Sequence, residues 1–344
     1  MPELLADHTT LHLGGPAGTW VEATTLEELT EAANDRDALI LGGGSNLVVA
    51  DEGVPGTVVH VATRGIAPDT EDTGPMCGGV LVTVAAGESL DDLVAYAVEH
   101  GWTGLEALSG IPGSVGATPI QNVGAYGAEV SQTIAQVRVW DRVLRGFRTF
   151  AMADCQFGYR HSRFKADPGR HVIVEVVFQL EPGTLSAPIR YAELAGTLGV
   201  EPGGRAPIAE VREAVLALRG AKGMVIDRAD HDTWSAGSFF TNPFVDPADV
   251  PPGAGGHPQP DGRVKINAAW LIEHAGYERG YGAAPTTPWG GRVSLSTKHV
   301  LALTNRGSGT TRELIALARE IRDGVEREFG IELVPEPVLL GADL

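Results

Sequence analysis

A run of three glycines between two apolar strands constrains the fold of this chain more than any other feature. Residues 38–41 have the character of a strand, Gly42, Gly43 and Gly44 follow, and residues 47–49 resume a strand. A Rossmann loop would lead into a helix, and a Walker loop would carry Lys after its last glycine, so the run is neither. Two interpretations remain: a hairpin turn, or a strand-loop-strand cradle whose N–H groups bind a pyrophosphate.

A second glycine-rich segment, residues 104–127, reads GLEALSGIPGSVGATPIQNVGAYG. It shows neither helical nor strand periodicity, and Glu106 is its only charged residue. Long ordered loops are uncommon unless they bind something, because their backbone polar groups need partners. The alternative is a loop that only covers a core. Two phosphate cradles in one domain would suit a dinucleotide.

Local signals predict helices and strands on both sides of these segments. Thr25 is expected to cap a helix that extends through Asn34, with Glu28 completing a capping box, and Ser89 to cap a helix that ends near Gly101. Residues 66–79 are expected to form an exposed loop and residues 251–262 a surface loop rich in Pro and Gly. Strands are expected at 18–24, 58–62, 80–86, 137–141 and 171–180, and helices at 208–219, 266–274 and 311–329.

Composition indicates a globular protein with more than one packed unit. The chain has 344 residues, of which 43% are hydrophobic, and one core rarely serves that length. The helices and strands indicate a mixed α/β protein, with a boundary between residues 181 and 204. The net charge of -18 repels phosphate backbones and anionic membranes, which disfavours nucleic-acid and membrane binding.

Cysteine use and hydropathy indicate a soluble intracellular protein. Cys77 and Cys155 lie far apart and have no metal-ligand spacing, so neither a disulfide framework nor a metal site is expected. The first fifteen residues lack the pattern of a signal peptide, and no apolar run reaches the length of about 18 residues that a spanning helix needs.

Five ordered sequence blocks resemble those of the UDP-N-acetylenolpyruvoylglucosamine reductases, also called UDP-N-acetylmuramate dehydrogenases. The blocks are LGGGSN at 41–46, the segment at 104–127, FGYR at 157–160, AGSFFTNP at 236–243 and VPEPV at 334–338. The resemblance spans nearly the whole chain. It implies an α+β fold, with a vanillyl-alcohol-oxidase (PCMH-type) FAD domain at 1–182, in lobes of about 1–63 and 64–182. A C-terminal UDP-sugar-binding domain would occupy 204–340, and its last strand would return to the active site.

The resemblance further implies FAD as cofactor and NADPH as co-substrate. Some flavoproteins of this superfamily attach the flavin to a His near the first glycine-rich loop, but residues 41–50 contain no His, so non-covalent FAD is expected. The implied cofactor-binding residues are Leu41, Gly42, Gly43, Gly44, Ser45, Asn46, Gly110, Pro112, Gly113, Gly116, Ala117, Ile120, Asn122, Gly124, Ala125, Tyr126 and Gly127.

The implied reaction reduces the enolpyruvyl ether of a UDP-sugar to a lactyl ether, a step in peptidoglycan precursor synthesis in the cytoplasm. Hydride transfer to the methylene carbon leaves negative charge on the adjoining carbon and its carboxylate, which needs electrostatic support and then a proton. By matching the family blocks, Arg160 is the stabilising guanidinium and Ser238 the proton donor. Glu336 matches the third catalytic position, and we expect it to be protonated or coupled to Arg160.

The resemblance also assigns residues that contact substrate or NADPH. These are Tyr159, Tyr191, Lys222, Gly237 and Asn242, and Tyr191 is typical of the longer type of the family, in which a loop caps the uridine diphosphate. Relatives often carry Lys where this chain has Thr241, and VPEPV is itself a variant, which leaves one phosphate contact and the register of Glu336 open.

Other functions remain compatible with these residues. One is an oxygen-using FAD oxidase of the same fold that acts on a sugar or aldonolactone. Another is a nucleotide-sugar-binding protein without catalysis, although the presence of Arg160, Ser238 and Glu336 together disfavours it. We expect a monomer or a weak oligomer.

Overall fold

The structure, a computed structural model, describes residues 2–69 and 79–344, and in these residues the chain forms two compact units. Unit 1 comprises Met1–Gly18, Gly44–Pro55 and Ala221–Leu344, and unit 2 comprises Thr19–Gly43 and Gly56–Gly220. This division differs from the expected boundary near residues 181–204. Cys77 and most of the loop expected at 66–79 lie outside the described residues.

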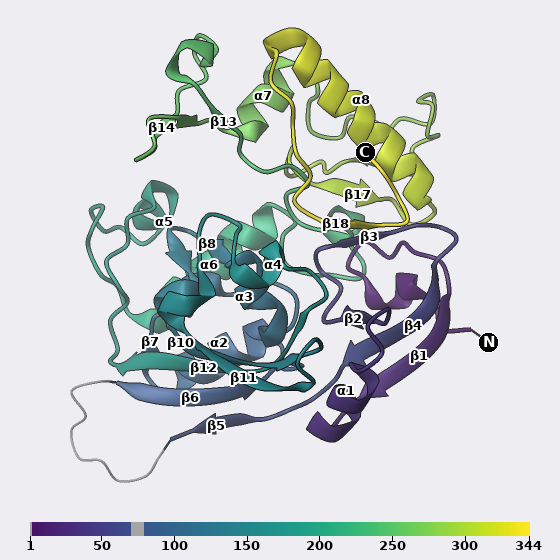
Figure 1. Cartoon of the computed structure of the whole chain (residues 1–344). Coiled ribbons are helices and arrows are strands. Elements are labelled where there is room, and N and C mark those ends of the chain that lie inside the picture. The colour runs from purple at the N-terminus through teal and green to yellow at the C-terminus, as the bar shows by residue number, and fades with distance from the viewer. Residues whose placement is uncertain (1, 70–78) are drawn as a thin grey trace. The chain divides into compact units, whose positions relative to one another are not determined.

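The main sheet of unit 2 is antiparallel (Figure 1). Its order is β11 (Gly146–Ala151), β10 (Ile134–Asp141), β12 (His171–Pro182), β6 (Val80–Ala85) and β5 (Ile66–Pro68), and β7 (Trp102–Thr103) also pairs with β12. The start of the predicted loop at 66–79 is therefore wrong. Residues 66–68 form a strand because their backbone pairs with β6, where Ile66 lies opposite Val84.

A smaller sheet in the same region has the order β1 (Ala17–Ala23), β4 (Val54–Val61) and β2 (Leu39–Leu41). Helix α1 (Leu26–Ala32) follows β1 and begins with the predicted capping box of Thr25 and Glu28. It ends two residues before the expected Asn34. The capping signal is local, so the sequence alone locates the start of this helix.

Helices α2 (Leu90–Glu99) and α6 (Ile208–Ala221) both belong to unit 2. Ser89 caps α2 as predicted by accepting a hydrogen bond from Asp92 N. The sequence placed α6 at the start of the second domain. In the structure its buried residues Val211 and Val215 pack in a small core with Leu194 of α5 (Ala192–Thr197), which explains why α6 belongs with the preceding segment.

Several short elements complete unit 2. They are α3 (Thr118–Gln121), β8 (Gly124–Ala125), β9 (Ala128–Glu129), α4 (Arg163–Ala166) and the 3-10 helices Glu106–Leu108, Val115–Ala117, Val130–Gln132 and Met152–Cys155. Cys155 is buried, and burial raises the pKa of its thiol to about 11.

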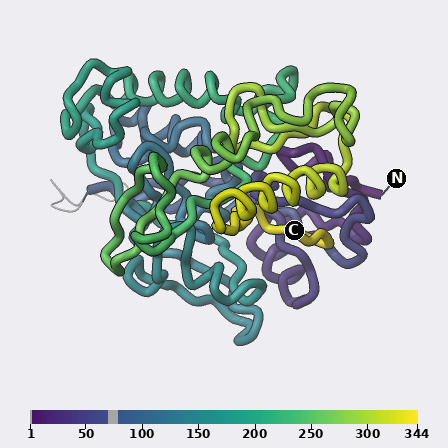
Figure 2. The backbone as a smooth tube through the Cα atoms, turned by 90° about the horizontal axis from the view of Figure 1, so that it is seen from above, coloured from purple at the N-terminus to yellow at the C-terminus, as the bar shows by residue number. Residues whose placement is uncertain are grey.

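The longest helix of unit 1 is α8 (Thr311–Phe329), drawn in yellow tones in Figures 1 and 2, and its bounds are those predicted. Thr310 and Glu313 form a capping box at its start, and Gly330 ends it with a φ of 68°. Helix α7 (Ala268–His274) starts two residues later than expected, because Asn267 caps it by accepting from Ala269 N. Unit 1 also contains the strands β13 (Phe244–Val245), β14 (His257–Pro258), β15 (Val264–Lys265), β16 (Val293–Leu295) and β17 (Leu303–Asn305), besides the two strands described next, and the 3-10 helices Leu5–His8, His231–Thr233 and Pro247–Asp249.

The strands on either side of the first glycine run pair with different partners. β2 pairs in parallel with β4, whereas β3 (Leu47–Val49) pairs in parallel with β18 (Val338–Leu340) near the C-terminus. The hairpin interpretation of this run is therefore wrong. Asp51, just after β3, also accepts hydrogen bonds from Thr311 N and Arg312 N at the start of α8, so residues 44–55 belong with the C-terminal part of the chain.

None of the helices in the parts of the chain that the structure describes combines the length and the apolar character needed to cross a lipid bilayer.

Candidate functional site

The two glycine-rich segments meet backbone to backbone in unit 2. A Cβ added at Gly43 would lie 2.7 Å from Gly113 Cα, and one added at Gly42 would lie 2.4 Å from Ser114 Oγ. Real Cβ atoms do not come this close, and at Gly43 the neighbouring atoms are backbone, so only glycine allows the contact with Gly113. Gly116 is tight in the same way, because a Cβ there would lie 2.6 Å from Ala86 Cβ. Glycine is therefore needed where the two loops approach each other. Such an approach is expected of a phosphate cradle, but not of a loop that only covers a core.

A small hollow of about 190 Å³ lies where these segments meet. Glycine backbone, the hydroxyl residues Ser89 and Ser114, and the charged residues Arg64 and Glu88 contribute to its lining. Arg64 Nη1 lies 3.3 Å from Glu88 Oε2, so the two charges form an ion pair. Peptide groups without side chains, hydroxyls and a guanidinium are the groups that bind phosphate oxygens. The glycine backbone and hydroxyls could therefore hold a diphosphate here, whereas the Glu88 carboxylate, which binds Arg64 and Gly65 N, would repel one.

Sequence reasoning missed the residues that line this hollow outside the glycine segments. His60 at the end of β4, Arg64 and Ser89 all contribute, and the His60 ring lies 5.4 Å from that of Trp20. Ser89 was recognised only as a helix cap. No local pattern marks the other two, because they reach the hollow through the pairing of distant strands.

Asn122 connects the second glycine-rich segment to the FGYR block. It has a left-handed backbone, with a φ of 47°, and its Nδ2 donates to Glu129 Oε2 at 2.8 Å and to Gly158 O at 3.1 Å. Its Oδ1 accepts from Ser131 N at 3.2 Å. Asn122 thus holds the end of its own segment against the residues that precede Arg160.

Arg160 lies beside the second glycine-rich segment. Its guanidinium donates to Asn122 O at 3.5 Å and to Gly124 O at 3.3 Å, and it lies 5.5 Å from the centre of the Tyr159 ring. The backbone of Arg160 has a φ of 50°, which is unusual for a residue with a side chain. Lys165 Nζ donates to its carbonyl at 3.1 Å. The structure therefore brings Arg160 and Tyr159 together with implied cofactor-binding residues.

Ser238 and Glu336 lie on neighbouring backbone segments in unit 1. Glu336 N donates to Phe239 O at 2.8 Å, and Phe240 forms an antiparallel bridge with Pro335. AGSFF and VPEPV therefore pair in a register that puts Glu336 opposite the residue after Ser238. Asn46 Nδ2 also donates to Glu336 O at 3.4 Å, which ties the end of the first glycine run to the same segment. Arg160 belongs to unit 2.

The remaining implied substrate residues of unit 1 have different surroundings. Asn242 Oδ1 accepts from Ala268 N at 2.9 Å, so its side chain supports the start of α7. Gly237 has a φ of 75° and no neighbouring atom within 4 Å of an added Cβ. Lys222 directly follows the end of α6 and is half-buried. Thr241, which stands where relatives often have Lys, donates to Val334 O at 3.3 Å and so joins the two paired segments instead.

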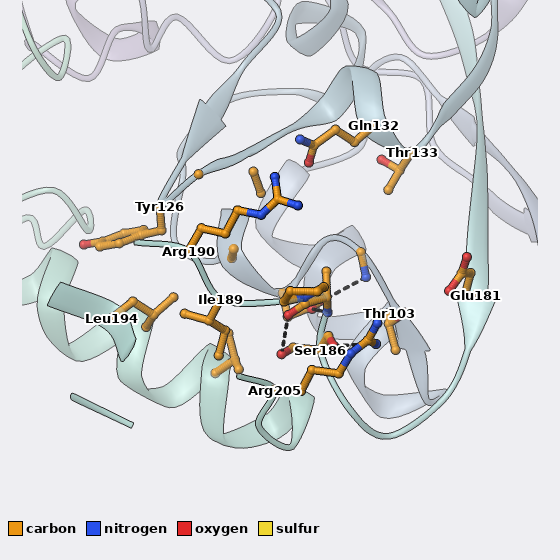
Figure 3. Close-up of a pocket in the computed structure, with 18 of the residues that line it drawn as sticks. Thr103, Tyr126, Gln132, Thr133, Glu181, Ser186, Ile189, Arg190, Leu194 and Arg205 are labelled. Atoms are coloured by element: carbon orange, nitrogen blue, oxygen red, sulfur yellow. Dashed lines mark hydrogen bonds between the residues drawn. The ribbon is translucent and has the colours of Figure 1, made fainter. Parts of the chain in front are cut away.

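Tyr191 is exposed at the start of α5, and its ring meets that of Tyr126 edge to face at 5.3 Å. Next to them, a pocket of about 420 Å³ is lined by Tyr126, Arg190, Gln132 and other residues of unit 2. Figure 3 shows the side chains of Arg190 and Gln132 extending toward one another in this pocket. Tyr126, implied in cofactor binding, and Tyr191, implied in substrate binding, thus contact each other.

Glu106, the only charge in the second glycine-rich segment, connects that segment to the wall of the pocket. Its carboxylate is buried and accepts from Gly104 N at 2.6 Å and Ala187 N at 3.3 Å. Ala187 precedes Tyr191 by four residues. Glu106 thus acts as a structural acceptor for backbone N–H groups in this part of the chain.

Comparison with known families agrees with this geometry. The family model "FAD binding domain" matches residues 21–143, which include the contact between Gly43 and Gly113 and the hollow beside it. The model "UDP-N-acetylenolpyruvoylglucosamine reductase, C-terminal domain" matches residues 228–340. Fold and site together define an FAD-dependent oxidoreductase.

Curated relatives match nearly the whole chain. A UDP-N-acetylenolpyruvoylglucosamine reductase of Cutibacterium acnes is 56% identical over 99% of this chain and 90% of its own length. One of Streptomyces avermitilis is 51% identical over 99% of this chain and 94% of its own length. This chain belongs to the UDP-N-acetylenolpyruvoylglucosamine reductase family.

A solved structure of similar fold is the UDP-N-acetylenolpyruvylglucosamine reductase of Thermus caldophilus. It is 26% identical, with a TM-score of 0.66, and the match covers 99% of this chain and 98% of the other. The resemblance seen in the sequence blocks is confirmed.

Proposed function

We propose that this chain reduces UDP-N-acetylenolpyruvoylglucosamine to UDP-N-acetylmuramate with NADPH, by way of bound FAD, with Arg160, Ser238 and Glu336 as catalytic residues. When bound, FAD accepts hydride from NADPH and delivers it to the substrate. The observation that carries the proposal is the pairing of AGSFF with VPEPV, in which Glu336 N lies 2.8 Å from Phe239 O. This pairing places the backbones of the two blocks that carry Ser238 and Glu336 next to each other.

Ser238 supplies the proton that completes the reduction. A free serine is a weak acid, so its surroundings must favour the alkoxide or relay a proton. Glu336 lies on the segment that pairs with the block of Ser238. A protonated or hydrogen-bonded carboxyl would stabilise negative charge on the substrate carboxylate, whereas an ionised one would repel it.

Arg160 stabilises the charge that develops on the substrate carboxylate. Its guanidinium is held by the carbonyl groups of Asn122 and Gly124, at 3.5 Å and 3.3 Å. These contacts use some of the N–H donors of the planar guanidinium and orient the remaining ones. A guanidinium can bind a carboxylate through two hydrogen bonds at once, which an ammonium cannot do equally well. Tyr159, Tyr191, Lys222, Gly237 and Asn242 complete the proposed substrate and NADPH contacts.

Domain roles follow the same proposal. The family matches at 21–143 and 228–340 support an FAD domain within residues 1–182 and a UDP-sugar domain within 204–340. Residues 1–18 and 44–55, however, belong to the same compact unit as the C-terminal part, and residues 204–220 belong to the other unit. A protein that uses NADPH and a nucleotide sugar acts in the cytoplasm, as a monomer or weak oligomer.

The test separates the two half-reactions. The purified protein should be yellow, and under anaerobic conditions NADPH should bleach the flavin absorbance, which the enolpyruvyl UDP-sugar should restore. Ser238→Ala should keep the bleaching step and lose the recovery. The control is Ser308→Ala, which changes an exposed serine of unit 1 and should behave as the unchanged protein. Equal slowing of both steps would rule out the proton-donor role, and recovery with oxygen alone would favour an oxidase.

A further inference from the structure

The peptide of Gly110, in the second glycine-rich segment, is held on both sides by charged side chains. Gly110 N donates to Asp91 Oδ1 at 2.6 Å, and Gly110 O accepts from Arg219 Nη2 at 3.3 Å. Gly110 is buried and has a φ of 70°, in the left-handed region that favours glycine. Both backbone polar groups of this buried residue, one in each of the two peptide groups that flank its Cα, therefore have fixed directions.

Asp91 is in turn held by Arg212. Arg212 Nη1 lies 2.6 Å from Asp91 Oδ1, and Nη2 lies 3.0 Å from Oδ2, so the pair is bidentate. Both side chains are largely shielded, with exposed fractions of 19% and 32%. Burial by itself would raise the pKa of Asp91, but the hydrogen bonds from Arg212 and Gly110 N lower it below its usual value. Bidentate charged pairs are directional as well as strong.

Arg212 and Arg219 both lie on α6, two turns apart, so one helix reaches the Gly110 peptide by two routes. This helix is far from the glycine-rich segment in sequence. Asp91 belongs to the first turn of α2, and that turn binds the same segment again, since Leu90 N donates to Gly113 O at 3.0 Å. The segment that follows Gly110 is thus held by α2 directly and by α6 through Asp91.

We propose that Arg212 is a positioning residue for FAD: through Asp91 it fixes the Gly110 peptide and so preorganises residues 110–117 for the cofactor. The proposal rests on the assignment of this segment to FAD. Arg212 acts through Asp91 and Gly110 and is not a catalytic residue. Without the Arg212 guanidinium, Asp91 loses two of its three described donors. Part of the free energy of FAD binding must then order the segment, which weakens the binding.

The test measures FAD affinity in apoprotein by quenching of FAD fluorescence. Arg212→Met should weaken FAD binding about tenfold, the scale of one lost charged hydrogen bond. Arg212→Lys should recover part of the affinity, because an ammonium can still bind one oxygen of Asp91. The matched control is Arg138→Met, which removes the ion pair of Arg138 with Glu175, 2.6 Å long in the same unit, and should leave FAD affinity unchanged.

A double-mutant cycle tests whether Arg212 acts on FAD binding through Asp91. Asp91→Asn and Arg212→Met should each weaken FAD binding, and the double variant should be little worse than either, because both break one route. Additive effects, or an unchanged affinity in folded Arg212→Met, would overturn the proposal. If Arg212→Met does not fold, Arg212→Lys and Asp91→Asn decide between these outcomes.

The assignment of the segment is tested separately with Gly43→Val, whose Cβ would collide with Gly113. Gly56→Ala is its control, since a Cβ there meets nothing within 4 Å. Normal FAD affinity in Gly43→Val would contradict the cofactor site itself. Lost affinity in Gly43→Val together with normal affinity in Arg212→Met would contradict only the positioning role.

Discussion

Three residues with side chains have left-handed backbones at the candidate site in unit 2. Asn122, Tyr126 and Arg160 have φ values of 47°, 50° and 50°. Such conformations cost about 1 kcal/mol or more, and they persist only where the surroundings stabilise them. For Asn122 the stabilising contacts are those to Glu129, Gly158 and Ser131. The strained residues thus lie where the second glycine-rich segment meets FGYR.

Glu336 provides a prediction at the scale of one residue. Glu336→Gln should lower the rate of the second half-reaction by roughly 10²–10³-fold, the usual effect of losing one charge-stabilising group. FAD should remain bound, and flavin reduction by NADPH should be unchanged, because the backbone bond from Glu336 N to Phe239 O does not depend on the side chain. Stopped-flow absorbance of each half-reaction checks this.

Glu332→Gln is the control, because Glu332 is exposed and lies on the same stretch of chain. It should retain both half-reactions. Near-normal turnover of Glu336→Gln would remove this carboxyl group from the proposed site.

Among the elements, the turn between β10 and β11 shows how one carboxylate stabilises a hairpin. Asp141 ends β10, is fully buried, and accepts from Val143 N at 2.9 Å and Leu144 N at 3.0 Å within the turn. Arg170 Nη2 lies 3.0 Å from its other oxygen. Burial raises the pKa of Asp141, but the hydrogen bonds from Arg170 and the turn lower it to about 2.

This carboxylate predicts an acid-dependent loss of stability. Because the folded-state pKa is depressed, Asp141 stabilises the fold above its unfolded value of 3.8, and that contribution is lost as the pH falls toward about 2. Asp141→Asn should lower the free energy of unfolding by about 2 kcal/mol at pH 7. It should also flatten the pH dependence between those values, as measured by urea unfolding. An unchanged acid profile would contradict the role of Asp141.

Elements with a local signal or a clear apolar alternation were predicted well, whereas the short strand β5 was not. The caps at Thr25 and Ser89 and the bounds of α8 agree with the sequence, because a capping side chain bonds to backbone within three residues. β5 was missed, since three residues become a strand only when β6 lies beside them. No periodicity can show such a partner.

At the scale of the whole molecule, unit 1 is assembled from separate stretches of sequence. Leu11 and Leu13 from the N-terminus and Val48 of β3 are buried in one core with Leu314 and Leu317 of α8. β18 has its strand partner in β3. The C-terminal part of the chain therefore depends on residues that precede it by hundreds of positions.

This dependence predicts the behaviour of a fragment. Residues 204–340, the domain expected from sequence, should retain helical circular dichroism but lack a cooperative thermal transition, because the fragment loses β3 and the buried Leu11, Leu13 and Val48. The full-length chain, under the same conditions, is the control. A cooperative transition with dispersed amide resonances would show that the C-terminal stretch has a sufficient core of its own.

The sequence by itself determined the local elements, the glycine-rich segments and the family to which the chain belongs. Capping residues, apolar periodicity and runs of glycine act over a few residues, so they can be recognised without knowing what lies beside them. The same blocks indicated FAD and named Arg160, Ser238 and Glu336, whose roles stay predictions.

Only the tertiary structure decided which distant segments meet. The sequence left a hairpin turn open at the first glycine run, but β2 pairs with β4 and β3 with β18. The pairing of Glu336 with Phe239 and the route from Arg212 through Asp91 to Gly110 have no local signal either. Strand pairing and buried ion pairs depend on free energy gained between residues remote in sequence, which no short stretch of the chain contains.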